Sequence, residues 1–377
     1  MREIRKGETM NEIKKLSSII INDSLKVRRK EKVLIISDTD KPALLIKEFI
    51  KDISKNEGIP FVEILFPSIE SLLLEKTTEE RIKQISIIEE QKINNFDTFI
   101  YIKYTKNEFE TIDIDPQILK NKGNALEKIN QTRVNERKWI LLNYPSELDA
   151  YKAKMNTDKY FQYALEVMTV DYNQMKQDIV PLLKLVEKTD KVRILSPNTD
   201  LTFSIKDIPI IPCCGECNIP DGEIYTAPVK NSVNGIITYN VPSVYHGNMY
   251  HNIQLTFENG KIIQATSDDN NNRLNEIFNT DDGSRYVGEF SLGLNPKILH
   301  PVGNILYDEK IIGSLHFTPG SSYYNAYNGN NSAIHWDLVL IQRKEYGGGE
   351  IYFDDILIRK DGMFVLPELQ HLNYLSK

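Results

Sequence analysis

The chain has 377 residues, of which 41% are hydrophobic and 26% are charged, the balance of an ordinary globular protein. This length exceeds that of one typical hydrophobic core and favours two domains. The net charge of −7 argues against a general nucleic-acid binder, and no apolar run approaches the roughly 20 residues that cross a membrane. The opening segment, MREIRKGETMNEIKKL, lacks the apolar region of a secretory signal, so we expect a cytoplasmic protein.

Helical and strand patterns alternate in the first half. Apolar runs predict a buried strand at residues 31–37 and further strands at residues 59–66, 96–104 and 136–145. Helical periodicity predicts helices at residues 10–27, 41–58 and 79–93. Strands that alternate with helices predict an α/β fold, a parallel sheet covered by helices. The first strand-to-helix turn, SDTDKPA, has no glycine, so neither a Rossmann fingerprint nor a P-loop is present.

The pattern changes at about residue 188. Residues 147–187 are predicted to be mostly helical, and short strands with Asn, Gly and Asp turns follow them. We therefore predict an N-terminal α/β domain over residues 1–187. A C-terminal α+β domain, rich in antiparallel strands, is predicted over residues 188–377.

All three cysteines, Cys213, Cys214 and Cys217, lie in the segment PCCGECNIP. An odd, clustered set is typical of a reducing cytoplasm rather than of a disulfide framework. A zinc ribbon would need a second C-x-x-C pair, which the sequence does not contain. Small buried residues are the simplest interpretation, and chance metal binding or sensitivity to oxidation stays open.

The segment NSAIHWDLVL places a histidine and a carboxylate in an otherwise apolar run. If residues 331–340 form a strand, His335 and Asp337 share one face while Ile334 and Trp336 lie on the other. A pair of this kind is typical of metal ligands. A core histidine that pairs with an aspartate is the alternative for an isolated H-x-D.

Further candidate ligands lie at other predicted strand ends of the second domain. The full candidate set is two histidines and three carboxylates: Glu223, Glu289, His316, His335 and Asp337. Zinc and cobalt accept both ligand types. Three carboxylates and one hydroxide balance two divalent cations, whereas a single ion would leave a buried cluster with net negative charge. The predicted cofactors are therefore two divalent metal ions per chain.

Four segments together carry a specific resemblance. NIPDGEIYTAP, VGEFSLGLNP, LYDEKIIGSLHFTPGSSY and SAIHWDLVL resemble, in this order, the signature segments of the aminopeptidase T and aminopeptidase S family of bacterial metallo-aminopeptidases. The similarity covers roughly residues 30–370. It implies a homodimer that binds two ions, zinc or cobalt and possibly manganese. It also implies that the family's metal ligands correspond to the five candidate residues and that its tyrosine corresponds to Tyr323.

The reaction implied is hydrolysis of the N-terminal peptide bond of a peptide with a free N-terminus. Tyr323 is a candidate donor to the developing oxyanion, although loops often carry tyrosines for packing. Glu289 is the best candidate for a carboxylate that both binds metal and shuttles a proton. Arg285 could orient Glu289 or meet a substrate carboxylate, with a surface salt bridge as the alternative. The histidines His246, His251, His300 and His371 are predicted to be structural.

Two other functions stay open. A related ring-cleaving dioxygenase of the dihydroxypyridine type would bind one iron through His316, His335 and Asp337. The presence of Glu223 and Glu289 argues against it, because a mononuclear site does not need them. A non-catalytic binding protein would be marked by lost ligands, and none of the five is lost. The short stretch between His316 and Asp337, where some relatives have an insertion, leaves the substrate preference open.

Overall fold

The computed structural model describes residues 2–245 and 247–373, and this part of the chain forms two compact units. The first unit is the chain up to Thr169 together with Gly215–Pro220. The second is Val170–Cys214 and the chain from Asp221 onward. His246 lies outside the described residues.

The first unit contains a parallel sheet with the strand order β2-β1-β3-β4-β8. Its strands are β1 (Lys32–Ser37), β2 (Ile59–Ile64), β3 (Thr98–Lys103), β4 (Lys138–Asn143) and β8 (Asn218–Ile219). The helices are α1 (Arg2–Ser18), α2 (Ala43–Lys55), α3 (Pro67–Glu75), α4 (Glu79–Asn95), α5 (Pro116–Glu136), α6 (Glu147–Lys152) and α7 (Thr157–Met168). A π-helical turn, Ile19–Ser24, follows α1. The predicted helix-covered parallel sheet is confirmed.

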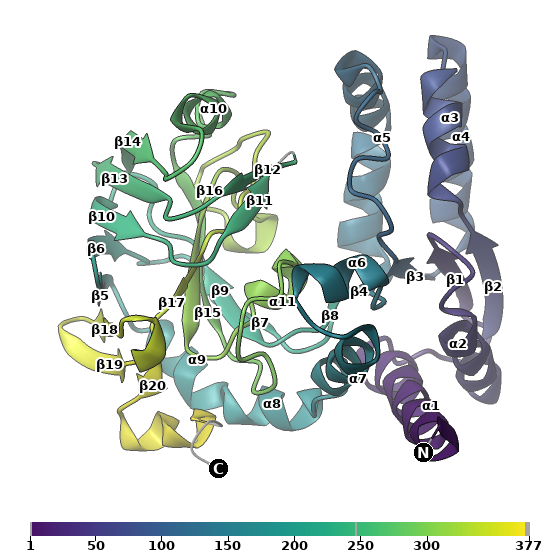
Figure 1. The fold of residues 1–377 in the computed structure, drawn as a ribbon, viewed down its shortest axis with the longest axis horizontal. Coiled ribbons are helices and arrows are strands. Elements are labelled where there is room, and N and C mark those ends of the chain that lie inside the picture. Colours follow the sequence, from purple (N-terminus) through teal and green to yellow (C-terminus); the bar gives the residue numbers. More distant parts are fainter. Residues whose placement is uncertain (1, 246, 374–377) are drawn as a thin grey trace. The chain divides into compact units, whose positions relative to one another are not determined.

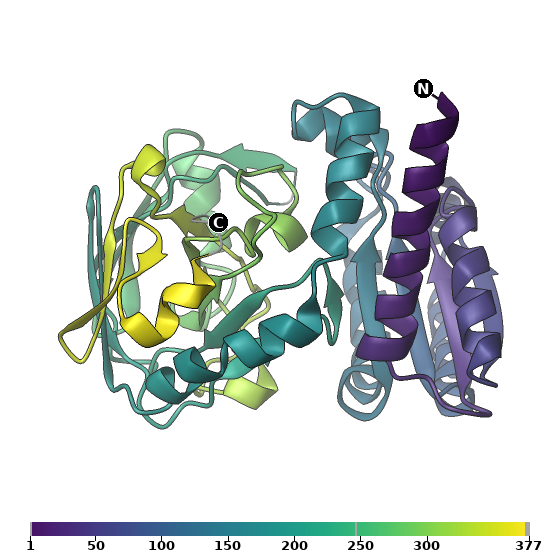
Figure 2. The ribbon, with the colours of Figure 1, turned by 90° about the horizontal axis from the view of Figure 1, so that it is seen from below.

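Both faces of this sheet are covered because its strands are apolar on both sides. Leu34 of β1 and Phe99 of β3 pack with Ile93 of α4 in one cluster. Val33 and Ile35, which point the other way, are also fully buried. Figures 1 and 2 show α4 and α5 over one face of the sheet and α1, α2 and α7 over the other.

The second unit is built from two antiparallel sheets. The larger has the order β14-β13-β10-β6-β5-β18-β19-β20 and the smaller has the order β17-β16-β15-β9-β7. The larger sheet comprises β5 (Lys191–Ser196), β6 (Thr199–Ser204), β10 (Asn234–Thr238), β13 (Gln254–Glu258), β14 (Lys261–Thr266), β18 (Glu350–Phe353), β19 (Ile356–Lys360) and β20 (Met363–Phe364). The smaller comprises β7 (Ile211–Cys213), β9 (Glu223–Thr226), β15 (Val287–Gly293), β16 (Ser314–Pro319) and β17 (Val339–Ile341). A hairpin joins β11 (Ser243–Tyr245) to β12 (Asn248–Tyr250).

Short helices surround these sheets. They are α8 (Tyr172–Asp178), α9 (Val180–Val186), α10 (Asn271–Ile277) and α11 (Ile305–Asp308). Three 3-10 turns, η2 (Tyr324–Ala326), η3 (Lys344–Tyr346) and η4 (Pro367–Leu372), complete the unit. The prediction of a second region rich in antiparallel strands is confirmed.

An aromatic cluster joins the two sheets of the second unit. Phe203 of β6 lies with its ring centroid 5.0 Å from those of both Phe290 in β15 and Phe317 in β16. Phe257 of β13 lies 6.0 Å from Phe317. The face of the smaller sheet that carries these rings is therefore the core face, and neighbours in the strands such as Glu289 and His316 point to the other face.

Along the chain, the first unit ends at Thr169 and the second begins at Val170, whereas the change in sequence pattern lies near residue 188. The helices α8 and α9 belong to the second unit, where the carbonyl oxygen of Asp178 lies 2.7 Å from Nε2 of His371. The predicted domain division at 187/188 stays a prediction. Among the described residues, no helix combines the length and the apolar character needed to cross a membrane.

Candidate metal centre

Three neighbouring strands of the smaller sheet carry polar side chains on one face. Glu223 begins β9, Glu289 lies in β15 and His316 lies in β16. Ser291 is paired with His316 across the sheet, and Glu289 stands two residues before Ser291. Since side chains on a strand alternate between faces, the register places these groups together on the face opposite the aromatic core.

Glu223, Glu289 and His316 form a buried group. Nε2 of His316 lies 3.0 Å from Oε1 of Glu289 and 3.7 Å from Oε2 of Glu223. The exposed fractions of the three residues are 5%, 3% and 1%. One ligand atom from each residue lies within 4.8 Å of the others, so a single metal ion could contact all three.

A second group shares Glu289. The other carboxylate oxygen of Glu289, Oε2, lies 3.3 Å from Nε2 of His335, which is itself 3.3 Å from Oδ1 of Asp337. These three residues also have ligand atoms within 4.8 Å of one another. The fold of the second unit thus brings the five predicted ligands together as two groups that share Glu289.

His335 and Asp337 do not lie in the strand expected over residues 331–340. Only Val339–Ile341 forms β17, and His335 makes an isolated bridge to Gly320. The backbone of Ala333 is held by a side chain, since it donates to the carboxylate of Asp281, whereas the carbonyl oxygen of Ile334 accepts from the backbone of Ser321. The expected alternation survives without the strand, because Ile334 and Trp336 are buried on the side away from the ligands.

Both histidines present Nε2 to the site because Nδ1 is occupied. Nδ1 of His316 lies 3.3 Å from the carbonyl oxygen of Glu309, and Nδ1 of His335 lies 2.8 Å from that of Ser321. A carbonyl oxygen only accepts hydrogen bonds, so each Nδ1 carries the hydrogen and each Nε2 can offer a lone pair. This arrangement is typical of metal-ligating histidines.

The carboxylates are oriented as well. The hydroxyl of Ser291 donates to Oε2 of Glu223 at 2.9 Å, and the hydroxyl of Thr318 donates to Oδ1 of Asp337 at 2.8 Å. Nε2 of His335 is buried and makes no hydrogen bond within the described part of the chain. A buried nitrogen without a hydrogen bond, aimed at carboxylates, fits a metal ligand.

The electrostatics of the two groups favour bound cations. Burial alone would lower the pKa of His316, but the carboxylates of Glu223 and Glu289 outweigh it and raise the pKa to about 10. The pKa of His335 is likewise raised against the effect of burial, with Asp337 as the main cause. Protons therefore compensate the negative charge of the groups, and metal ions can replace them in this role.

Three charged residues beside the site were not predicted from the sequence. The ammonium of Lys310 lies 2.5 Å from Oε1 of Glu223, 2.6 Å from Oε1 of Glu309 and 3.9 Å from Oδ1 of Asp221. Burial would lower the pKa of Lys310, but these carboxylates together raise it well above its usual value. The sequence signal was the pair Glu309–Lys310 directly before the apolar run that leads to His316.

Tyr323 lies beside the second group. Its ring centroid is 4.7 Å from that of His335 and 5.5 Å from that of Tyr225, while 47% of the residue is exposed. Burial of the hydroxyl, followed by the charges of Glu289 and Asp337, raises its pKa well above the usual value. The phenol is therefore neutral and able to donate a hydrogen bond. The turn after β16 returns Tyr323 to the site, but against His335 rather than against His316.

Arg285 is not brought to this cluster. Its guanidinium donates to the side chains of Asn279 and Asn275 and to the carbonyl oxygen of Ile262, at 3.0–3.2 Å. These bonds fix the segment before β15 to α10 and β14. These hydrogen bonds give Arg285 a structural role. A contact between Arg285 and the substrate stays a prediction.

The other described histidines also have partners away from the five ligands. Nδ1 of His251 lies 3.1 Å from the carboxylate of Asp269, and Nδ1 of His300 lies 2.9 Å from the hydroxyl of Tyr346. His371 contacts the backbone of Asp178. These contacts are in keeping with the structural roles predicted for the three residues.

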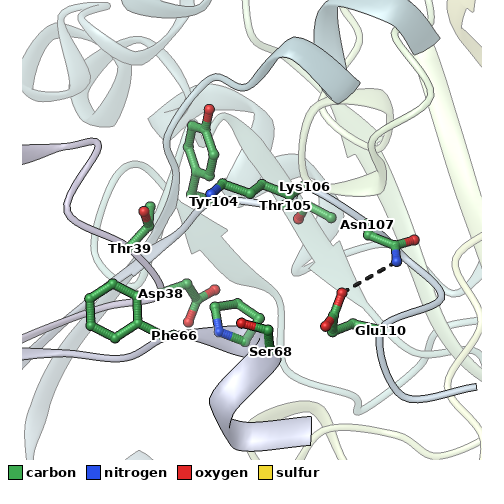
Figure 3. Close-up of a pocket in the computed structure, with 10 residues that line it drawn as sticks. Asp38, Thr39, Phe66, Ser68, Tyr104, Thr105, Lys106, Asn107 and Glu110 are labelled. Atoms are coloured by element: carbon green, nitrogen blue, oxygen red, sulfur yellow. Dashed lines mark hydrogen bonds between the residues drawn. The ribbon is translucent and has the colours of Figure 1, made fainter.

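A separate pocket of about 280 Å³ lies in the first unit, beyond the carboxyl ends of β1, β2 and β3. Figure 3 shows Asp38, Lys106 and Glu110 among its lining residues, with the side chain of Asn107 bonded to Glu110 at 3.3 Å. Asp38 is paired with Lys103 at 3.6 Å. Both acidic groups of the pocket therefore have partners of their own, and the pocket contains none of the predicted ligands.

Two carboxylate–histidine groups of this kind on one face of a sheet are typical of the class of metal-dependent enzymes. Within this class, the chain belongs to the family of thermophilic metalloproteases (M29), whose model matches residues 9–364. The resemblance seen in the four sequence segments is thereby confirmed.

One curated relative is the aminopeptidase AmpS of Bacillus subtilis (strain 168), which is 33% identical over 126 residues. The alignment covers 32% of this chain and spans only 30% of that relative's own length. Among solved structures, the wild-type AmpT of Thermus thermophilus has a TM-score of 0.77 at 15% identity, with 94% of this chain and 99% of that one covered. The 2,5-dihydroxypyridine dioxygenase of Pseudomonas putida KT2440 has a TM-score of 0.61, also at 15% identity, with 95% and 98% covered. At these identities the two structures show the shared fold.

Proposed function

We propose that the protein is a metal-dependent aminopeptidase that removes N-terminal residues from peptides. The observation that carries the proposal is the position of Glu289, whose two carboxylate oxygens each face a different histidine and so join two ligand groups. In this proposal Glu223, Glu289 and His316 hold one divalent ion, and Glu289, His335 and Asp337 hold the other. Zinc and cobalt, and also manganese, suit this mixture of nitrogen and oxygen ligands.

When bound, such a pair of ions polarises the scissile carbonyl and lowers the pKa of the attacking water. The residues of the chain supply the rest of the chemistry. Glu289 accepts the proton of the water and passes it towards the leaving amine. The neutral hydroxyl of Tyr323 donates a hydrogen bond to the oxyanion as negative charge develops on it.

The proposed substrate is a peptide with a free N-terminus. The name of the Bacillus relative supports this choice, as does the family to which the chain belongs. A free amine is a good partner for a site that is rich in carboxylates. An N-acetylated peptide lacks this charge and should be resistant.

The test is the hydrolysis of a panel of aminoacyl fluorogenic amides by metal-free and metal-loaded protein. Chelation should abolish turnover, and zinc, cobalt or manganese should restore it. Full activity in protein shown to be metal-free would exclude the proposal. Equal cleavage of free and N-acetylated peptides would exclude an aminopeptidase, and binding of peptides without cleavage would indicate a non-catalytic protein.

The dioxygenase is kept as a second candidate because His316, His335 and Asp337 could form an iron-binding triad and because the fold is shared. It predicts one iron per chain and oxygen uptake with a dihydroxypyridine. Metal analysis of the purified protein separates the two functions, since the peptidase binds two ions.

A cytoplasmic homodimer completes the proposal. In the described part of the chain no disulfide joins Cys213, Cys214 or Cys217, which suits a reducing compartment. Light scattering at micromolar concentration tests the dimer, and a monomeric mass with activity retained would contradict it.

A further inference from the structure

Lys310 is a buried cation inside the acidic cluster. It follows α11, and only 1% of the residue is exposed. Its ammonium contacts Glu223 and Glu309 directly and lies 3.9 Å from Asp221. An ammonium taken out of water in this way is stable only because carboxylates surround it.

The same place has the ligands of a metal site. The thiol of Cys213 and carboxylate oxygens of Asp221 and Glu223 all lie within 4.8 Å of one another. The register of β7 and β9 sets Cys213 directly opposite Glu223, which explains why the thiol is here. The ammonium of Lys310 supplies the positive charge that balances these two carboxylates.

The two carboxylate oxygens of Glu223 also have different partners. Oε1 accepts from the ammonium at 2.5 Å. Oε2 accepts from Ser291 at 2.9 Å and faces Nε2 of His316 at 3.7 Å. One oxygen is thus held away from the proposed metal centre and the other is aimed at it.

We propose that Lys310 is a positioning residue that acts as a tethered cation: it fills the position between Cys213, Asp221 and Glu223, and so confines metal ions to the two groups that share Glu289. The inference rests on the proposed metal centre. Without the ammonium, three buried carboxylates lose their counter-charge, and a divalent ion is the natural replacement. That ion would have a thiolate ligand, which the proposed centre does not have.

Cobalt provides the test, because a cobalt ion bound to a thiolate absorbs in the near ultraviolet by charge transfer, whereas carboxylate and imidazole ligands give no such band. Lys310→Met removes the charge and keeps an unbranched side chain that is one atom shorter. Cobalt-loaded Lys310→Met should show the band and contain one ion more per chain than the parent, which should lack the band. The double variant Lys310→Met/Cys213→Ser should lose the band, and Lys310→Arg, which keeps the charge, should resemble the parent. Lys360→Met, which removes a surface ion pair with Glu350, is the matched control.

A Lys310→Met protein with the metal content of the parent and no charge-transfer band would overturn the inference. If this variant is insoluble when purified without metal, it is purified with cobalt, and Lys310→Gln is measured beside it. If cobalt does not make Lys310→Met and Lys310→Gln soluble, this would also count against the inference, since a divalent ion is expected to replace the ammonium. Failure of the proposed function gives a different result: the parent protein itself then binds no metal or hydrolyses no aminoacyl amide.

Discussion

Tyr323 is the residue that separates catalysis from metal binding. Its ring lies against His335, and its hydroxyl is close enough to Glu289 and Asp337 for their charges to raise its pKa. The neutral phenol is thus placed to donate a hydrogen bond without acting as a ligand. The proposed role therefore predicts a defect in turnover rather than in metal content.

We expect Tyr323→Phe to lower kcat by about 10²–10³, the usual effect of losing one oxyanion donor. KM should change little and the metal content should be retained, because the ring and its packing stay. Steady-state kinetics and metal analysis of the same sample check this. Parental turnover would make Tyr323 structural, whereas loss of an ion would make it a ligand.

At the scale of residues, the sequence predicted which ligands lie together but not how they are supported. The five ligands are chemically conspicuous and stand in four recognisable segments. Lys310 was missed because a lysine is ordinarily exposed, and its burial results from the neighbouring carboxylates of Asp221 and Glu223, which come from a distant part of the chain.

At the scale of elements, the turn between β16 and His335 positions the second ligand group. Gly320 has φ of +111°, and a Cβ there would lie 2.1 Å from the carbonyl oxygen of Ile334. Gly329, in the same loop, has φ of +87° but has open space around it. Substitution of both glycines by alanine therefore separates the cost of a positive φ from the cost of a steric clash.

We expect Gly320→Ala to lower the free energy of unfolding by about 2–4 kcal/mol, since the clash with backbone atoms adds to the strain. Gly329→Ala should cost only about 1 kcal/mol, from the left-handed conformation alone. Urea denaturation of the metal-free variants measures both. Equal losses would show that the contact with Ile334 is not important.

Asp281 anchors the segment that leads to His335. Its carboxylate accepts hydrogen bonds from the backbone of Ala333 at 2.6 Å and from the hydroxyl of Ser332 at 2.8 Å. It also accepts from the backbone of Gly283 and of Ser284, each at 2.9 Å. Partial burial would raise the pKa of Asp281, but these hydrogen bonds outweigh it and lower the pKa.

A lowered carboxyl pKa stabilises the fold above the unfolded-state value, near 3.9, and this contribution is lost as the pH falls through the folded-state value. We expect Asp281→Asn to lower stability at neutral pH by about 1 kcal/mol. The difference from the parent should shrink as the pH falls below about 4. Urea denaturation at several pH values checks this, and a difference independent of pH would contradict it.

The sequence predicted the elements whose hydrophobic periodicity is strong and missed those in which it is weak. The strands around Leu34 and Phe99 were evident from apolar runs. The helices Pro67–Glu75 and Pro116–Glu136 were not identified, because apolar residues such as Leu72 and Leu119 stay exposed and leave no clear stripe. The strand expected at residues 331–340 is mostly irregular, since only part of its backbone bonds to β16, as at Trp336 and Leu338, while Ala333 bonds to the side chain of Asp281.

At the scale of the whole molecule, all five predicted ligands belong to the second compact unit. The segment 215–220 belongs to the first unit, where β8 pairs with β4. No sequence pattern predicted this pairing, because a strand of two residues carries no periodicity of its own. The alternation of helices and strands was sufficient for the parallel sheet itself.

Metal binding should therefore protect the second unit selectively. In hydrogen exchange, we expect zinc or cobalt to slow the exchange of β9, β15, β16 and the segment around His335, by up to the binding free energy of about 2.7 kcal/mol at a hundredfold excess over Kd. Exchange in β1 and β3 of the first unit should be unchanged. Equal protection of the parallel sheet would show that ions bind elsewhere as well.

The shared carboxylate of Glu289 also has a thermodynamic consequence. Because one side chain has an oxygen in each ligand group, ions at the two groups of the proposed centre would not bind independently. Whatever factor the first ion applies to the affinity for the second, the second must apply to the first, since linkage between two bound ligands is reciprocal. Mutual repulsion of the ions would make this coupling negative, whereas the fixing of Glu289 by the first ion would make it positive. The sign of the measured cooperativity therefore reports which effect dominates.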